Sequence, residues 1–182
     1  MLNRFSLALC TVVLCACAAE DPASRVRFHN EPYPTHLSEW NLFTVKDHFA
    51  FSSGVIPYDL NIELFSDYAQ KLRTLYIPPG HTARYNAETP FEFPTGTIVS
   101  KSFFYFVHDS NARLLLNAEW DGNPKNLVGR DIRLVETRLL VRQEHGWDTL
   151  PYIWHGDDAT LSISGDLLSL KTNQPAAMRD SG

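Results

Sequence analysis

Charged residues inside otherwise apolar segments are the strongest candidates for chemistry in this sequence. Lys101 lies in the run TIVSKSFFYFV, and Glu136 and Arg138 lie in RLVETRLLVR. If both segments are strands of one sheet, these side chains can share a face, with Arg73 close by. Such a network could bind a carboxylate or a sugar, or dock a partner protein. The alternative is a solvated sheet face or a structural ion pair.

A second set of candidates is aromatic or acidic. Trp147 and Trp154 could stack on a sugar ring, although core packing is the more common role of such residues. Asp59 and Asp67 are weaker binding candidates within segment 54–80, which combines many aromatic and turn residues. Both sets predict binding rather than catalysis.

Motifs for catalysis and for cofactors are absent from the sequence. None of the seven histidines forms an H-x-H, H-x-x-H or H-x-x-x-H pair, so we predict no metal site from local spacing. There is no G-x-S-x-G, no P-loop and no G-x-G-x-x-G. There is also no C-x-x-C-H, so haem c cannot attach covalently to this chain. A metal-dependent enzyme would need ligands that are distant in sequence, and it stays open as an alternative.

The N-terminal region is typical of an exported protein. Arg4 precedes an apolar run at 5–16, which is too short to span a bilayer, and we assign residues 1–16 to a signal peptide. The run ends in Leu-Cys-Ala-Cys, which resembles a bacterial lipobox with Cys17 as the lipidated residue. An ordinary export signal cut after Ala18 or Ala19 is the alternative. Because Ala18, not Asp, follows Cys17, we expect a periplasmic or outer-membrane lipoprotein of a Gram-negative bacterium.

Length and composition favour one globular domain. The chain has 182 residues, of which 44% are hydrophobic, and a net charge of −5. Its basic residues are scattered, which argues against a nucleic-acid surface. All three cysteines lie in the first 17 residues, so the remaining chain has no thiol.

Hydrophobic alternation predicts an all-β protein. Strand patterns occupy 71–77, 97–107 and 133–142, the last with a hairpin partner at 150–154, and shorter strands are expected at 113–117 and 161–164. Short helical turns are expected after Ser38 and at 63–70. We therefore predict an antiparallel β-sandwich or jelly-roll-like domain over 37–170, preceded by a lipid-anchored tether at 17–36 and followed by a loose tail at 171–182.

Three segments carry a resemblance to a known family. The stretches YDLNIELFSDYAQKLR, FEFPTGTIVSKSFF and ETRLLVRQEHGW resemble an uncharacterised family of exported bacterial proteins, in which such a domain precedes a c-type cytochrome segment. The resemblance covers about residues 37–166. Ile62-Glu63 stands where the family usually has Thr-Pro, and the chain ends at Gly182 before the place of the family's haem-binding segment. The resemblance transfers no catalytic residue.

The expected function follows from the export signal and this resemblance. We expect a cell-envelope binding or docking domain beside a c-type cytochrome or another electron-transfer protein. It would hold no cofactor itself, since haem c is expected only in a missing downstream segment. A carbohydrate- or small-ligand-binding β-sandwich, a metal-dependent enzyme and a truncated gene fragment remain alternatives.

Overall fold

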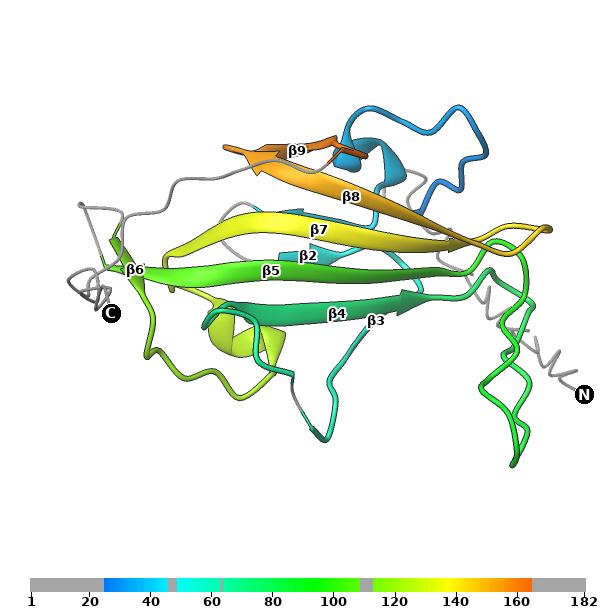
Figure 1. Ribbon diagram of the computed structural model, residues 1–182, viewed down its shortest axis with the longest axis horizontal. Helices are drawn as coiled ribbons and strands as arrows, with labels where there is room; N and C mark the ends of the chain where they lie inside the picture. Colours follow the sequence, from blue (N-terminus) through cyan, green and yellow to red (C-terminus); the bar gives the residue numbers. More distant parts are fainter. Residues whose placement is uncertain (1–24, 46–48, 63, 109–112, 165–182) are drawn as a thin grey trace, which may run out of the picture.

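The chain folds into two antiparallel sheets of unequal size (Figure 1). The computed structural model describes residues 25–45, 49–62, 64–108 and 113–164. The larger sheet has seven strands, in the order β3-β4-β5-β7-β8-β9 with β6 paired to β5. Its strands are β3 (Val55–Tyr58), β4 (Gln70–Tyr76), β5 (Ile98–His108), β6 (Arg113–Leu115), β7 (Ile132–Arg142), β8 (Trp147–His155) and β9 (Asp158–Leu161). The prediction of an all-β antiparallel sandwich is confirmed.

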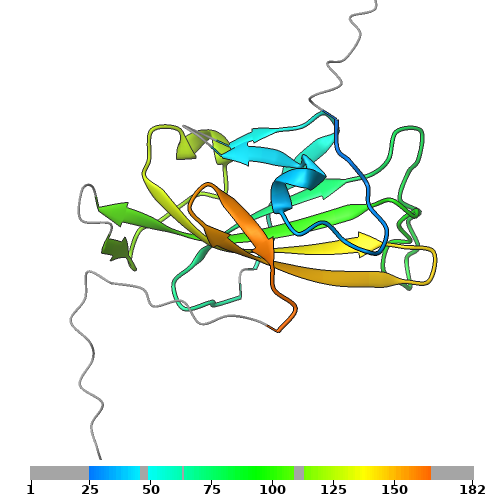
Figure 2. The ribbon, with the colours of Figure 1, turned by 90° about the horizontal axis from the view of Figure 1, so that it is seen from above.

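The smaller layer covers one face of the large sheet. It consists of the paired strands β1 (Phe43–Val45) and β2 (Phe49–Phe51) and the 3-10 helix η2 (Leu37–Trp40), all on the same side (Figure 2). Trp40 is fully buried, and its indole Nε1 donates a hydrogen bond to the Tyr152 hydroxyl of β8 at 2.8 Å. Burying this ring between the layers is a large source of stability.

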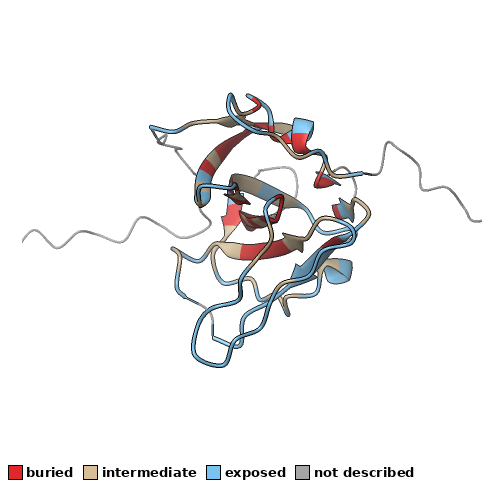
Figure 3. Cartoon of the chain, turned by 90° about the vertical axis from the view of Figure 1, so that its right-hand side faces the viewer, coloured by how far each residue is buried: buried red, intermediate tan, exposed pale blue. Residues whose placement is uncertain are grey.

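The hydrophobic core lies between the two layers. Most buried residues lie on the strands, with a few on the 3-10 helices, whereas the connecting loops are mainly exposed (Figure 3). The core side chains that the large sheet contributes include Leu72, Ile98, Phe104, Leu139, Val141 and Leu150. We call this the core face of the sheet, and we call the opposite side its open face.

Residues 25–36 belong to the folded domain and do not form the tether that the sequence predicts there. Val26, Phe28 and Tyr33 pack against the core. Isolated β-bridges join Arg25 to Ser53 and His36 to Thr160. The proline and charged residues of this segment gave it the composition of a linker, but its apolar side chains find places on the core. Residues 1–24, including the signal peptide and Cys17, and the tail at 171–182 lie outside the described residues.

The structure also differs from expectation between β3 and β4. The described residues 64–69 form no helix, because Asp67 and Tyr68 have φ angles of 47° and 64°, in the left-handed region.

The short elements elsewhere in the chain also differ from the prediction. The last strand is Asp158–Leu161 rather than 161–164. Three short strands, β1 to β3, were not predicted, and a second 3-10 helix, η4 (Pro124–Leu127), precedes β7. No described helix is long and apolar enough to span a bilayer.

Candidate functional site: the charged open face of the sheet

Three cations form a row across the centre of the open face. Arg73 on β4 is paired with Lys101 on β5, and Lys101 is paired with Arg138 on β7. Directly opposed side chains in adjacent strands lie close together. The strand pairing therefore brings together three of the candidate residues named from the sequence. We call them the basic row.

Arg73 is clamped by one of the other candidates. Its side chain is only 5% exposed, and its Nη1 donates to the Asp59 carboxylate at 2.9 Å. Asp59 lies in the loop after β3, and this loop touches Gly122: a Cβ atom at Gly122 would lie 2.2 Å from Asp59 Oδ2. Gly122 also has a φ of 78°, so a side chain there would be both strained and obstructed. The Asp59–Arg73 ion pair thus holds the loop after β3 against the sheet, and the loop that contains Gly122 packs against Asp59.

Arg138 is neutralised by the neighbouring acid on its own strand. Its Nε donates to Glu136 Oε1 at 2.6 Å and its Nη2 donates to Glu136 Oε2 at 2.9 Å. This two-pronged geometry is the strong form of an arginine–carboxylate pair. The hydrogen bonds that Arg138 donates to Glu136 raise the pKa of Arg138.

Lys101 is the member of the basic row whose charge has no such partner. None of the described residues makes a hydrogen bond or ion pair with its ammonium, which lies 5.1 Å from the centroid of the Phe103 ring. Burial lowers the pKa of Lys101, and the positive charges of Arg138, Arg73 and Lys71 lower it further, while the charge of Glu136 opposes part of this shift. An anion placed beside this half-buried ammonium would reverse that electrostatic penalty.

A loop covers one end of the open face. The backbone carbonyl of Leu64 accepts a hydrogen bond from the buried Lys71 ammonium. The carbonyl of Asp67 accepts one from the Tyr105 hydroxyl at 3.0 Å. Asp67, a binding candidate from the sequence, therefore contributes its main chain to the positioning of the loop.

The two candidate tryptophans do not form one platform. Trp154 is buried and donates its indole N–H to the Thr137 hydroxyl at 2.9 Å, inside the core. Trp147 is 40% exposed at the other end of β8, with the Phe93 ring 5.8 Å from its own and the Arg142 guanidinium 5.8 Å above it. A sugar-stacking role can therefore rest on Trp147 alone.

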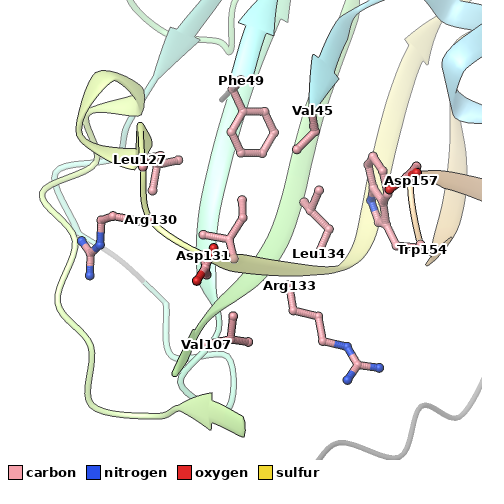
Figure 4. A pocket seen from close by; sticks show the side chains of 13 residues that line it. Val45, Phe49, Val107, Leu127, Arg130, Asp131, Arg133, Leu134, Trp154 and Asp157 are labelled. Carbon is pink, nitrogen blue, oxygen red and sulfur yellow. The ribbon is translucent and has the colours of Figure 1, made fainter. Parts of the chain in front are cut away.

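Sequence reasoning missed a cavity of about 710 Å³ beside the β1–β2 pair (Figure 4). Phe49, Leu127, Leu134 and Trp154 form apolar walls, whereas Arg133 points away from the space. Because the walls come from four separate segments, no local motif could reveal it. Its polar lining residues are exposed ones at the rim, so the cavity contains no buried polar group that would select a ligand.

Within the described ranges, no group of three or more histidine, cysteine, aspartate or glutamate side chains could hold a metal ion. Comparison of the chain with protein-family models, with curated proteins and with solved structures gave no match. The resemblance to the cytochrome-associated family stays a prediction.

Proposed function

We propose that this chain is an exported, lipid-anchored binding domain of the cell envelope, which docks a c-type cytochrome or another electron-transfer protein. The basic row would bind carboxylates on that partner. The observation that carries this proposal is Lys101, a half-buried cation between two arginines that makes no hydrogen bond or ion pair with a described residue. The signal-like N-terminus supports export, and the family resemblance supports the class of partner.

The chemistry of the row favours a carboxylate. Arg73 and Arg138 each already hold one acid, so an incoming acid would meet the ammonium of Lys101. A hydrogen bond to a charged group in such a site contributes about 1.5–3 kcal/mol. The Phe103 ring, which lies 5.1 Å from both Lys101 Nζ and Arg138 Cζ, offers an apolar floor for the rest of the bound group.

The proposed anchor would turn this face away from the membrane. Segment 25–40 lies on the same side of the large sheet as the β1–β2 pair (Figure 2), whereas the strand pairing places the basic row on the open face. The eight steps from Cys17 to Arg25 (25 − 17) span at most about 28 Å. The open face would then be directed toward proteins of the periplasm.

Membrane fractionation tests the anchor. Cys17→Ala should release the protein from membranes into the soluble periplasmic fraction, since a lipid chain is the proposed attachment. A Cys17→Ala variant that still sediments with membranes would contradict the lipobox interpretation.

A titration with hexanoate followed by NMR tests the binding site. Amide resonances of the basic row should shift, the shifts should vanish in Lys101→Met, and they should persist in the control Lys125→Met on the exposed helix η4. Hexylammonium, with the same alkyl chain and the opposite charge, should leave them unchanged. Equal responses to both ligands, or none to hexanoate, would overturn the carboxylate site.

The exposed ring of Trp147 favours carbohydrate binding as a second candidate function. Its fluorescence should then change on addition of a neutral oligosaccharide such as cellohexaose, because a sugar stacked on the indole changes its environment. An unchanged spectrum, together with a response to hexanoate at Lys101, would remove this candidate.

A further inference from the structure

The loop between β3 and β4 exposes an unusual number of large apolar side chains. Five of them have exposed fractions between 46% and 81%. We call these residues the apolar ledge: Leu60, Ile62, Leu64, Phe65 and Tyr68. Single exposed apolar residues are normal, but several on one short loop, two of them with rings in contact, favour an interaction surface.

The apolar ledge is held in a defined shape by polar contacts from the sheet. Asp59 binds Arg73, Lys71 binds the Leu64 carbonyl, and Tyr105 binds the Asp67 carbonyl. These three contacts attach the loop to β4 at two points and to β5 at one. A surface that is fixed before binding loses less conformational entropy when a partner docks.

The conformation of the ledge carries local strain as well. Asp67 and the ledge residue Tyr68 both have left-handed backbone angles, at a cost of about 1–2 kcal/mol each. The Phe65 and Tyr68 rings meet edge to face at 5.1 Å. Strained backbone persists where surrounding contacts fix it, and it is concentrated at functional sites.

The charges near the apolar ledge indicate which kind of partner can bind there. Lys71 and Arg73, on the strand beside the ledge, are buried and already bind the Leu64 carbonyl and the Asp59 carboxylate. Lys101 on the next strand is therefore the cation that can meet a partner's carboxylate. A second copy docked symmetrically through the ledge would bring two Lys101 ammonium groups together, which is unfavourable. A lipid surface is disfavoured because segment 25–40, which follows the proposed anchor, lies on the other side of the sheet (Figure 2). A protein whose apolar patch is bordered by carboxylates complements both features.

We infer that the apolar ledge docks a protein partner through an apolar patch bordered by carboxylates. This inference rests on the proposed function, because the partner's carboxylates are those that the basic row would take. It adds a second, apolar contact surface beside Lys101 and defines the partner by the chemistry of its surface.

Site-specific photo-crosslinking in living cells, with the full chain, tests this inference. A benzophenone side chain is placed at Phe65, and at Tyr85 as a matched control, because both residues are 73% exposed. We expect one crosslinked protein from position 65 and none from position 85. The attached peptide of that protein should contain apolar residues next to Asp or Glu. Lys101→Glu should reduce the crosslinking yield about tenfold or more, because the new negative charge would repel the partner's carboxylates.

Several results would overturn the inference. They are the same products from both positions, a crosslink only to a second copy of this chain, a crosslink only to lipid, or a yield that Lys101→Glu does not change. Thermal denaturation of each variant verifies that it is folded. A positive hexanoate titration without a product at Phe65 would remove the ledge and leave the proposed function. A Phe65-specific protein product without a hexanoate response would remove the proposed carboxylate site and keep the ledge only as an apolar docking surface.

Discussion

Both faces of the large sheet carry polar side chains, but the two faces differ in how completely these side chains are hydrogen-bonded or paired with opposite charge. On the core face, hydroxyl groups pair across neighbouring strands: Thr74 with Ser100 at 2.6 Å and Ser102 with Thr137 at 2.8 Å. Thr137 also accepts the indole N–H of Trp154. Among the described residues, no buried side-chain nitrogen or oxygen atom lacks a hydrogen-bond partner. The hydroxyl groups of this network bond to one another and to the Trp154 indole, so no buried donor or acceptor is left to bind a ligand.

The open face of the same strands is charged and incompletely paired. Arg73 and Arg138 each have a carboxylate, whereas Lys101 between them has none from the described residues. Burial and the neighbouring cations both disfavour the charged form of Lys101, and Glu136 offsets only part of this effect. The contrast separates polar residues that build the fold from polar residues that remain available for binding.

The largest expected effect lies where the layers meet on the core face. Trp40→Ala should lower the free energy of unfolding by about 3–5 kcal/mol, because it removes a buried ring and leaves a cavity. Chemical denaturation measures this loss. The exposed Trp147→Ala is the matched control and should cost much less, since 40% of that residue is exposed.

The hydroxyl network should be the next most sensitive feature. Thr137→Val keeps the shape of the side chain but removes the acceptor of the Trp154 indole, so we expect a loss of about 1–3 kcal/mol. The double variant Ser102→Ala/Thr137→Val should lose less than the sum of the single variants, because their hydroxyl groups share a hydrogen bond. Strict additivity would show that the two hydroxyls act independently.

The clamp between Asp59 and Arg73 should contribute a smaller amount. Asp59→Asn removes the charge opposite a buried guanidinium, and we expect a loss of about 1 kcal/mol because the carboxylate is partly exposed. Asp67→Asn leaves the carbonyl that anchors the same loop and serves as the control. Equal losses in the two variants would contradict the role assigned to the Asp59 carboxylate.

Lys101→Met should have the smallest effect on stability at neutral pH, and its distinguishing effect is on the pH dependence of stability. We expect a change within about 0.5 kcal/mol at neutral pH. The pKa of Lys101 lies below its usual 10.5 in the folded protein, so the folded state loses its proton first as the pH rises. The stability contribution of Lys101 should therefore increase between the folded-state pKa and 10.5. The wild type minus Lys101→Met difference in unfolding free energy should show this rise, and a flat difference would contradict it.

Alternation in the sequence was sufficient to predict the central strands and their faces. The patterns at 97–107 and 133–142 correspond to β5 and β7, and they place Lys101 and Arg138 on the face opposite Ser100 and Leu139. Period-two alternation carries this information because each side chain in a strand points away from its neighbours in the chain.

The loops and the chain ends could not be predicted in the same way. The ledge depends on the left-handed Tyr68 and on contacts such as Lys71 with the Leu64 carbonyl, which exist only after β3 and β4 have paired. The short strands β1 to β3 have three or four residues each, too few to show a period. The place of Tyr33 beside Trp40, with ring centroids 6.1 Å apart, likewise follows from the tertiary fold.

Competitive acetylation of lysines, with and without hexanoate, tests the central claim most directly. At about pH 8, a lysine with a lowered pKa has a larger reactive fraction than an ordinary one. Lys101 should therefore be modified ahead of the more exposed Lys125, and hexanoate should protect Lys101 alone. Modification of Lys101 more slowly than Lys125, with no protection by hexanoate, would contradict the assignment of the open face as the binding face.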